Sequence, residues 1–240
     1  MNTCQQSIKI QSFPHFSNIK NVYFIYAERP HTSVVILHKN NNIDMTTIIP
    51  AFKLDESVIN TANVLMFDMD GTLVDTDYAN YLSYIHAIRQ ITQSNINSCY
   101  NPSVRFTREQ LLKAIPTLSN MEYEAITTLK NDLYANYLHE TAINESITEI
   151  LKRYSKTKQI ILVTNSRKER ACETLKYHGL LGRFNYMFCQ QPHGEIKNKY
   201  EYAVTSMQIN PASVVVFENE TTEVNAAKFA GIPNGNIIHI

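Results

Sequence analysis

Residues 64–75 read VLMFDMDGTLVD, an apolar run followed by two aspartates and a glycine. The apolar run is typical of a buried β-strand, and Gly71 indicates a turn directly after it. Because Asp68 and Asp70 are two residues apart, their side chains point to the same side of an extended chain. Two neighbouring carboxylates repel each other unless a cation compensates them. The stretch therefore predicts a strand that delivers two acids to one pocket, where a divalent metal would offset their charge and chemistry on a phosphoryl group would supply the functional need for them.

The run from Asp68 to Leu73 resembles, without a gap, the DxDGTL motif of the haloacid-dehalogenase-like phosphohydrolase superfamily. A lone DxD is common by chance, whereas DxDGTL directly after an apolar strand is not. The competing interpretation is an ordinary strand and Asp-Gly turn whose acids are merely solvated. The resemblance covers roughly residues 62–240. It implies an α/β core, a helical cap over the active site, and phosphate chemistry rather than dehalogenation.

From residue 63 onward, strand patterns alternate with helical patterns. Strands are expected at residues 64–67, 159–163, 186–189, 214–217 and 237–240. Apolar residues recur with a period near 3.6 in four helical segments, at about 147–154, 167–178, 200–207 and 222–230. Glycines at positions 179 and 231 would end two of them. Such alternation favours a mostly parallel sheet with right-handed crossovers, so the predicted fold class is α/β with a Rossmann-like core.

One connection is much longer than the others. Helical patterns occur at residues 78–91 and 126–138, and a shorter helix is expected from Thr107 to just before Pro116. A structureless loop of this length is improbable in a compact domain, so the segment is interpreted as an inserted helical subdomain. By resemblance it is the cap. The expected division is a core of residues 61–77 and 141–240 and a cap of residues 78–140.

The first 60 residues lie outside the resemblance. Segments 22–26, 33–38 and 45–49 are rich in strand-forming residues and predict a small antiparallel meander. This β-rich N-terminal extension is either an accessory layer on the core or a docking element for a partner chain. The accessory layer is favoured, because sheet edges need covering.

Composition limits the classes of function. The chain has 240 residues, long enough for one domain with an insertion, and it balances 22 basic against 22 acidic residues. This balance excludes binding of nucleic acid through bulk charge. The apolar runs are too short to span a bilayer, and the four cysteines follow no zinc pattern. We therefore expect a soluble, cytoplasmic protein with no membrane or nucleic-acid partner.

The resemblance assigns roles to the residues that follow the first two core strands. Asp68 would be the nucleophile that forms an aspartyl-phosphate, and Asp70 the general acid and then base. Thr164 matches the second motif, so its hydroxyl and nearby N–H groups, with Asn165, would hold a phosphoryl oxygen. Taken alone, Thr164-Asn165-Ser166 also reads as an ordinary helix N-cap.

The third motif is a lysine that neutralises the phosphoryl group and the nucleophile. Lys197 is preferred because its distance to the fourth motif is nearer the usual one, and Lys199 is the alternative. On the first cap helix, Arg89 could contact an anionic substrate, although a solvated side chain is the competing interpretation.

The fourth motif departs from the family pattern. Members commonly carry an acidic pair whose Asp ligates magnesium, whereas this chain has Asn219 there, which offers a carbonyl oxygen without charge. Acids on either side could coordinate directly or through water, and they would also suit a helix N-terminus. The expected Mg²⁺ ligands are Asp68, the backbone carbonyl of Asp70, and groups from Glu218, Asn219 and Glu223.

Together these features predict magnesium-dependent hydrolysis of a small phosphorylated metabolite through an aspartyl-phosphate. Two alternatives stay open. A sugar-phosphate mutase would use the same four motifs. A degenerate member would bind a phosphorylated ligand or a protein partner without turnover, as Asn219 and the first 60 residues suggest.

Overall fold

The structure is a computed structural model that describes residues 56–93, 100–102, 104–190 and 198–240, together with the backbone of three strands nearer the N-terminus. One compact unit, residues 54–97 with 105–240, contains the central sheet and the cap helices. The three N-terminal strands belong to another unit.

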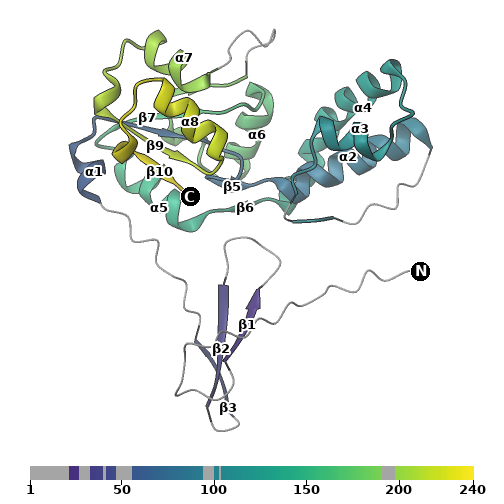
Figure 1. The fold of residues 1–240 in the computed structure, drawn as a ribbon, viewed down its shortest axis with the longest axis horizontal. Helices are drawn as coiled ribbons and strands as arrows, with labels where there is room; N and C mark the ends of the chain where they lie inside the picture. The colour runs from purple at the N-terminus through teal and green to yellow at the C-terminus, as the bar shows by residue number, and fades with distance from the viewer. Residues whose placement is uncertain are drawn as a thin grey trace. The chain divides into compact units, whose positions relative to one another are not determined.

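The central sheet has five parallel strands in the order β10-β9-β4-β7-β8. Figure 1 labels β7, β9 and β10 of this sheet. Their bounds are β4 Val64–Phe67, β7 Gln159–Val163, β8 Tyr186–Phe188, β9 Val214–Glu218 and β10 Ile237–His239. Each lies within one residue of the range expected from the sequence. The prediction of an α/β fold with a mostly parallel, Rossmann-like sheet is therefore confirmed.

Alternate residues of the strands face opposite sides of the sheet, and each side is covered by helices. Leu65 and Phe67 of β4 belong to one buried cluster, whereas Val64 and Met66 belong to the other. The first cluster contains residues of α1 Glu56–Thr61, α5 Glu145–Tyr154 and α6 Lys168–Tyr177. The second contains residues of α7 Lys199–Ser206 and α8 Thr221–Phe229. The result is a three-layer sandwich in which β4 is buried on both faces. The sequence did not indicate α1.

The expected glycine stops are present at two helix ends. Gly179 follows α6 with a φ of +67°, and Gly231 follows α8 with a φ of +85°. These left-handed conformations are ones that glycine adopts without steric cost.

The helical insertion begins and ends at a small antiparallel pair, β5 Val74–Asp75 with β6 Ala142–Ile143, which the sequence pattern did not reveal. Its helices are α2 Asp77–Thr92, α3 Arg108–Ala114, α4 Asn120–Leu133 and the 3₁₀ helix η1 Tyr134–Glu140. The short helix starts after Thr107 and ends before Pro116, as expected. The second long pattern differs, because α4 already begins at Asn120 and continues as η1. None of the described helices is both long and apolar enough to cross a bilayer.

The order of the strands fixes where a ligand can bind. From the central strand β4 the chain first adds β7 and β8 on one side, and then β9 and β10 on the other. Parallel sheets of this kind bind ligands beyond the carboxyl ends of the strands, at the point where the direction of winding reverses. That point lies between β4 and β9, which are followed by Asp68 and Asn219.

The N-terminal strands form a separate antiparallel sheet. β1 Val22–Tyr26 pairs with β2 Ser33–Lys39, which pairs with β3 Asn42–Thr46. The third strand begins three residues earlier than the expected 45–49, and residues 47–49 lie outside the described part of the chain. The role proposed for residues 1–60 stays a prediction.

Candidate active site

The acids of the DxD motif are buried. Asp68 follows β4 with 5% of its surface exposed, and Asp70 is 7% exposed. The interpretation of these acids as merely solvated is therefore wrong. Thr164, at the end of β7, is also buried, and its Oγ1 accepts a hydrogen bond from the backbone N–H of Ser166 at 3.1 Å. These four residues and Asn165 line one pocket of about 840 Å³.

A lysine lies directly against Asp68. Lys199 Nζ is 2.7 Å from Asp68 Oδ1, 2.9 Å from Glu218 Oε2 and 3.7 Å from Glu223 Oε2. Burial alone would lower the pKa of Lys199, but the carboxylates of Asp68 and Glu218 outweigh burial and raise it above its ordinary value. Lys197, the lysine preferred from sequence spacing, lies outside the described residues. The lysine that the structure brings to Asp68 is thus the alternative, Lys199.

The cap of helix α7 explains why Lys199 reaches the site. The Asn198 side chain accepts hydrogen bonds from the N–H groups of Tyr200 and Glu201 at 3.0 and 3.1 Å, which makes Lys199 the first residue of the helix. An asparagine followed three residues later by Glu201 is a recognisable N-terminal signal, and it could have favoured Lys199 from the sequence.

The charge of Asp68 is only partly compensated. Burial raises its pKa to about 8, and the neighbouring carboxylates of Glu218 and Asp70 add to this effect. Lys199 opposes it, but that single ammonium also serves Glu218 and Glu223. A second cation at this position would stabilise the ionised form of Asp68, which is the form a nucleophile requires.

Asp70 has the opposite electrostatic environment. The hydroxyls of Thr76 and Ser166 each donate a hydrogen bond to its carboxylate at 2.5 Å, and Arg170 Nη2 and Arg105 Nη2 lie 2.7 and 3.4 Å away. Burial alone would raise the pKa of Asp70. Arg170, Arg105 and the two hydroxyl donors outweigh burial and hold it well below its usual range. Asp70 is therefore ionised at neutral pH.

Arg170 is one of the residues that sequence reasoning missed. The basic run from Arg167 to Arg170 reads as a solvated helix face, and for Arg170 this interpretation is wrong. Only 16% of its side chain is exposed, because it lies in the first turn of α6 and faces the pocket. The available signal was position: α6 begins at Lys168, shortly after Thr164 at the carboxyl end of a core strand, so its first turn borders any ligand bound there.

Asn219 lies where the family pattern has an aspartate. Its Oδ1 accepts a hydrogen bond from Thr72 Oγ1 at 2.9 Å. If the amide is turned over, its nitrogen donates to the Asp70 backbone carbonyl and to Glu218 Oε1, each at 3.2 Å. The amide thus has two useful orientations. With the nitrogen toward these acceptors the amide satisfies their hydrogen bonds, and with the oxygen toward them it would offer a ligand to a cation.

The oxygen atoms of Asp68, Asp70 and Asn219 suit a magnesium ion that also binds a phosphoryl group. The described residues contain no group of three or more His, Cys, Asp or Glu side chains arranged to hold a metal. The available donors are one carboxylate, on Asp68, and two carbonyl oxygens, from Asp70 and Asn219. Mg²⁺ commonly uses few protein oxygens and completes its shell with water and phosphate oxygens. The donor set therefore suits Mg²⁺ bound together with a phosphoryl group.

Two acids expected as ligands have other partners. Glu218 is fully buried: its Oε1 accepts from the N–H groups of Asn219 and Glu220, and its Oε2 accepts from the Tyr200 hydroxyl at 2.7 Å. Glu223 Oε1 accepts a hydrogen bond from Asn165 Nδ2 at 3.1 Å. Both acids therefore hold the surrounding side chains in position. Tyr200 was not anticipated, since a tyrosine on a buried helix face reads as part of the core.

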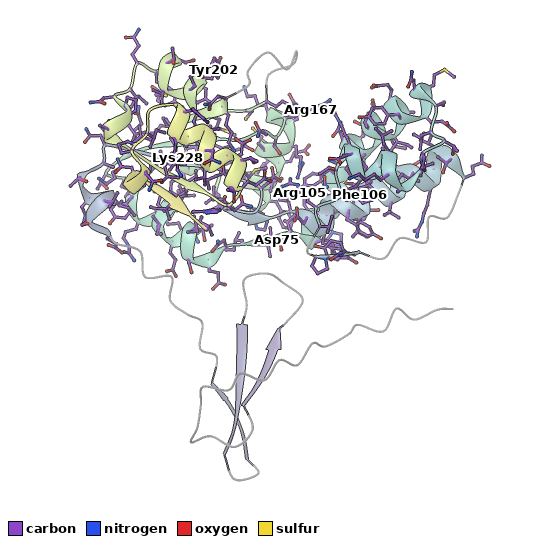
Figure 2. The ribbon with its side chains drawn as sticks, in the orientation of Figure 1. Asp75, Arg105, Phe106, Arg167, Tyr202 and Lys228 are labelled. Carbon is purple, nitrogen blue, oxygen red and sulfur yellow. The ribbon has the colours of Figure 1, made fainter. Side chains whose placement is uncertain are left out.

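Arg89 is not brought to the site. It is exposed in the last turn of α2 and does not line the pocket. Cations from other parts of the insertion line it instead, namely Arg105, Arg108 and Lys130. Figure 2 labels Arg105 at the junction between the core and the cap helices, where it also lies 3.5 Å from Asp77.

Gly71 allows a test of the contact with Asn219. Alanine at position 71, where φ is +84°, would place its Cβ 2.4 Å from Asn219 Nδ2, whereas a Cβ at Gly179 meets nothing within 4 Å. We expect Gly71→Ala and Gly179→Ala each to lose about 1–2 kcal/mol of stability from left-handed strain. Only Gly71→Ala should also lose magnesium-dependent activity, by at least about tenfold. Equal activity of the two variants, measured beside denaturant unfolding, would contradict a role for the position of Asn219.

Comparisons with known proteins agree with this geometry. Among curated proteins, none matches the sequence of this chain. A solved structure of a haloacid dehalogenase-like hydrolase from Streptococcus pneumoniae is 17% identical, with a TM-score of 0.59, covering 72% of this chain and 83% of its own. A protein described as a predicted phosphoglycolate phosphatase from Haemophilus somnus is 18% identical, with a TM-score of 0.60 and coverage of 71% of this chain and 83% of its own.

A third solved structure, described as a β-phosphoglucomutase from Thermotoga maritima, is 25% identical, with a TM-score of 0.54 and coverage of 73% and 83%. At these identities the solved structures show a shared fold. The family itself is shown by the sequence model of the haloacid dehalogenase-like hydrolases, which matches residues 65–236. That match includes both aspartates of the motif and extends through the fourth core strand. This chain therefore belongs to the haloacid dehalogenase-like hydrolase family.

Proposed function

We propose that this protein is a magnesium-dependent phosphatase that hydrolyses a small phosphomonoester through an aspartyl-phosphate at Asp68. The observation that carries the proposal is the contact of 2.7 Å between Lys199 Nζ and the Asp68 carboxylate, buried at the carboxyl end of the central strand. A carboxylate paired with a lysine beside two further acids is suited to covalent phosphoryl transfer. Action in the cytoplasm stays a prediction.

The reaction would proceed in two displacements. In the first, an Asp68 oxygen bonds to phosphorus while the bond to the ester oxygen breaks. Because Asp70 is ionised, the ester oxygen takes up a proton from water and leaves as an alcohol. In the second, water attacks phosphorus, the bond to Asp68 breaks, and inorganic phosphate leaves. Asp70, kept ionised by Arg170 and Arg105, is suited to accept the proton of that water.

The remaining side chains would stabilise charge. Lys199 offsets the negative charge of the phosphoryl group and of the Asp68 carboxylate. The Thr164 hydroxyl and nearby N–H groups, at the start of α6, would donate to a phosphoryl oxygen. Mg²⁺ held by Asp68, the Asp70 carbonyl and Asn219 would withdraw charge from the phosphoryl oxygens.

The test is phosphate release from a panel of small phosphomonoesters, with Mg²⁺ and with EDTA. Magnesium-dependent release of free phosphate supports the phosphatase. A mutase would instead convert a sugar phosphate to its isomer without releasing phosphate, which analysis of the products separates. Ligand binding with no product from any compound would favour the non-catalytic alternative and overturn the proposal.

Asn219 supplies a prediction for the metal. We expect Asn219→Asp to bind Mg²⁺ at least about tenfold more tightly, because a carboxylate adds a charge that the amide lacks. Without metal the same variant should be less stable than wild type, since the new anion lies close to Glu218 and Asp70. Thermal unfolding with and without Mg²⁺ measures both effects. An unchanged response to Mg²⁺ would show that Asn219 does not face the ion.

A further inference from the structure

Lys130 is a buried cation that has no anionic partner among the described residues. It lies on α4, lines the same pocket as Asp68, and is only 6% exposed. Within the described part of the chain, its ammonium has no hydrogen bond and no ion pair. Its ammonium instead approaches two aromatic rings: Nζ lies 4.9 Å from the ring centre of Tyr84 and 5.9 Å from that of Tyr134. Aromatic faces compensate a cation only weakly compared with a carboxylate.

Arg170 presents a second unused donor to this pocket. Its Nη2 pairs with Asp70, but its buried Nε has no hydrogen-bond partner among the described residues. Its guanidinium lies 4.3 Å from the ring centre of Tyr134, the same ring that Lys130 approaches. The cap and the core thus each contribute a cationic donor to one aromatic side chain, and each donor is left with unused hydrogen-bonding capacity.

Burial and the neighbouring charges together determine the pKa of Lys130. Burial is the largest effect, and it lowers the pKa of Lys130 to about 7. Arg170, Arg105 and Arg108 lower it further, while Asp70 is the acid that raises it. The other acids on the pocket wall near α4 and α6, Asp132, Glu169 and Glu173, are exposed to solvent.

A buried cation of this kind costs stability, and an apolar side chain of similar length would cost less. Residues that reduce stability without a structural benefit are characteristic of functional sites. An anion bound between Lys130 and Arg170 would satisfy both donors and reduce the repulsion between them.

We propose that Lys130 and Arg170 form an anion subsite, and that the substrate carries a carboxylate or a second phosphate in addition to the phosphoryl group transferred to Asp68. This inference rests on the proposed phosphatase function. It narrows the substrate class from small phosphomonoesters in general to those with a second anionic group within the same pocket.

Three substrates with the same three-carbon chain test the inference: n-propyl phosphate, 3-phosphooxypropanoate and 1,3-propanediol bisphosphate. They differ in the terminal group, which is methyl, carboxylate or phosphate, so they also show which anion is preferred. We expect wild type to prefer at least one charged substrate over n-propyl phosphate by about 10- to 100-fold in kcat/KM. Lys130→Met should abolish most of that preference, and Lys130→Arg should retain it.

A control variant removes an exposed ammonium group from another helix of the cap. Lys113 is exposed and pairs with Glu109 on α3, so Lys113→Met should leave the substrate preference unchanged. Equal preference for all three substrates in wild type, or an equal loss in Lys130→Met and Lys130→Arg, would overturn the anion subsite.

Binding separates failure of this inference from failure of the proposed function. In the Asp68→Asn variant, the same three compounds are compared by the shift they cause in Tm, with and without Lys130→Met. A larger shift with a charged compound that needs Lys130 supports the subsite even if no compound is hydrolysed. No difference among the compounds overturns it, whatever the phosphatase assay shows.

Stability distinguishes a functional Lys130 from a structural one. The pKa of the Lys130 ammonium falls from about 10.4 in an unfolded chain to about 7 in the fold. The charged ammonium therefore lowers the stability of the fold most below pH 7, and this effect fades as the pH rises toward 10. Lys130→Met should therefore have a higher Tm than wild type at pH 6, and the gap should narrow by pH 9. A lower Tm for the variant at every pH would indicate that Lys130 supports the fold, which contradicts the inference.

Discussion

Asp68→Asn is expected to lower phosphate release at least about 10⁴-fold while the protein stays folded. Asparagine has nearly the shape of aspartate, but its amide cannot form the acyl-phosphate bond. Lys199 keeps the carboxylates of Glu218 and Glu223 as partners in the variant, so no unpaired buried cation is created. Phosphate release measures the loss, and circular dichroism with thermal unfolding verifies the fold.

Asp75→Asn is a matched control for this substitution. Asp75 belongs to the same stretch of sequence, and its Oδ1 accepts a hydrogen bond from the backbone N–H of Asp77 at 3.1 Å, but it does not line the pocket. An asparagine side chain can accept the same bond, so activity should change less than about threefold. If Asp68→Asn retained normal turnover, Asp68 could not be the nucleophile, and the proposed aspartyl-phosphate would have to be abandoned.

Lys199→Met is expected to affect both stability and turnover. Removal of the Lys199 ammonium, which lies against Asp68, Glu218 and Glu223, leaves Asp68 and Glu218 buried without this cation. The loss should cost about 3–5 kcal/mol in the free energy of unfolding. Turnover should fall at least about 10³-fold, because the charge that stabilises the transferred phosphoryl group is lost. Denaturant unfolding and phosphate release measure the two effects separately.

A double variant separates the two effects of this substitution. Combining Lys199→Met with Glu218→Gln removes opposite charges together, so part of the lost stability should return while activity stays low. Lys197→Met provides the comparison between the two lysines. Loss of turnover in Lys197→Met but not in Lys199→Met would restore the assignment made from sequence spacing.

The sequence predicted the core because its signals are local. A run of four apolar residues before Asp68 indicates a buried strand wherever it occurs, and Gly179 and Gly231 end helices through their own backbone freedom. Elements without such signals were missed. β5 and β6 have two residues each, too few for a period to appear, and α1 has only one buried residue.

Much of the candidate site depends on which surfaces meet. Arg170 and Lys130 both occur in helical patterns where a basic residue normally faces water. Their burial follows from the packing of η1 against α6 and of α4 against α2, which no local pattern encodes. The contacts of Asn219 also depend on tertiary packing. Its departure from the motif is visible in the sequence, but its contact with Thr72 and the Asp70 carbonyl requires β9 to lie beside β4.

By itself, the sequence determined the family, the order of the five core strands and of the helices between the later ones, and the acids that follow the central strand. Each of these depends on residues close together in the chain. Only the tertiary structure decided that Lys199 meets Asp68 and that Arg170 and Arg105 hold Asp70 ionised. It also decided that Lys130 is buried with no anion beside it in the described part of the chain. Those contacts join residues about 35 to 130 positions apart, and their energies depend on burial and on neighbouring charges that exist only after the helices have packed on the sheet.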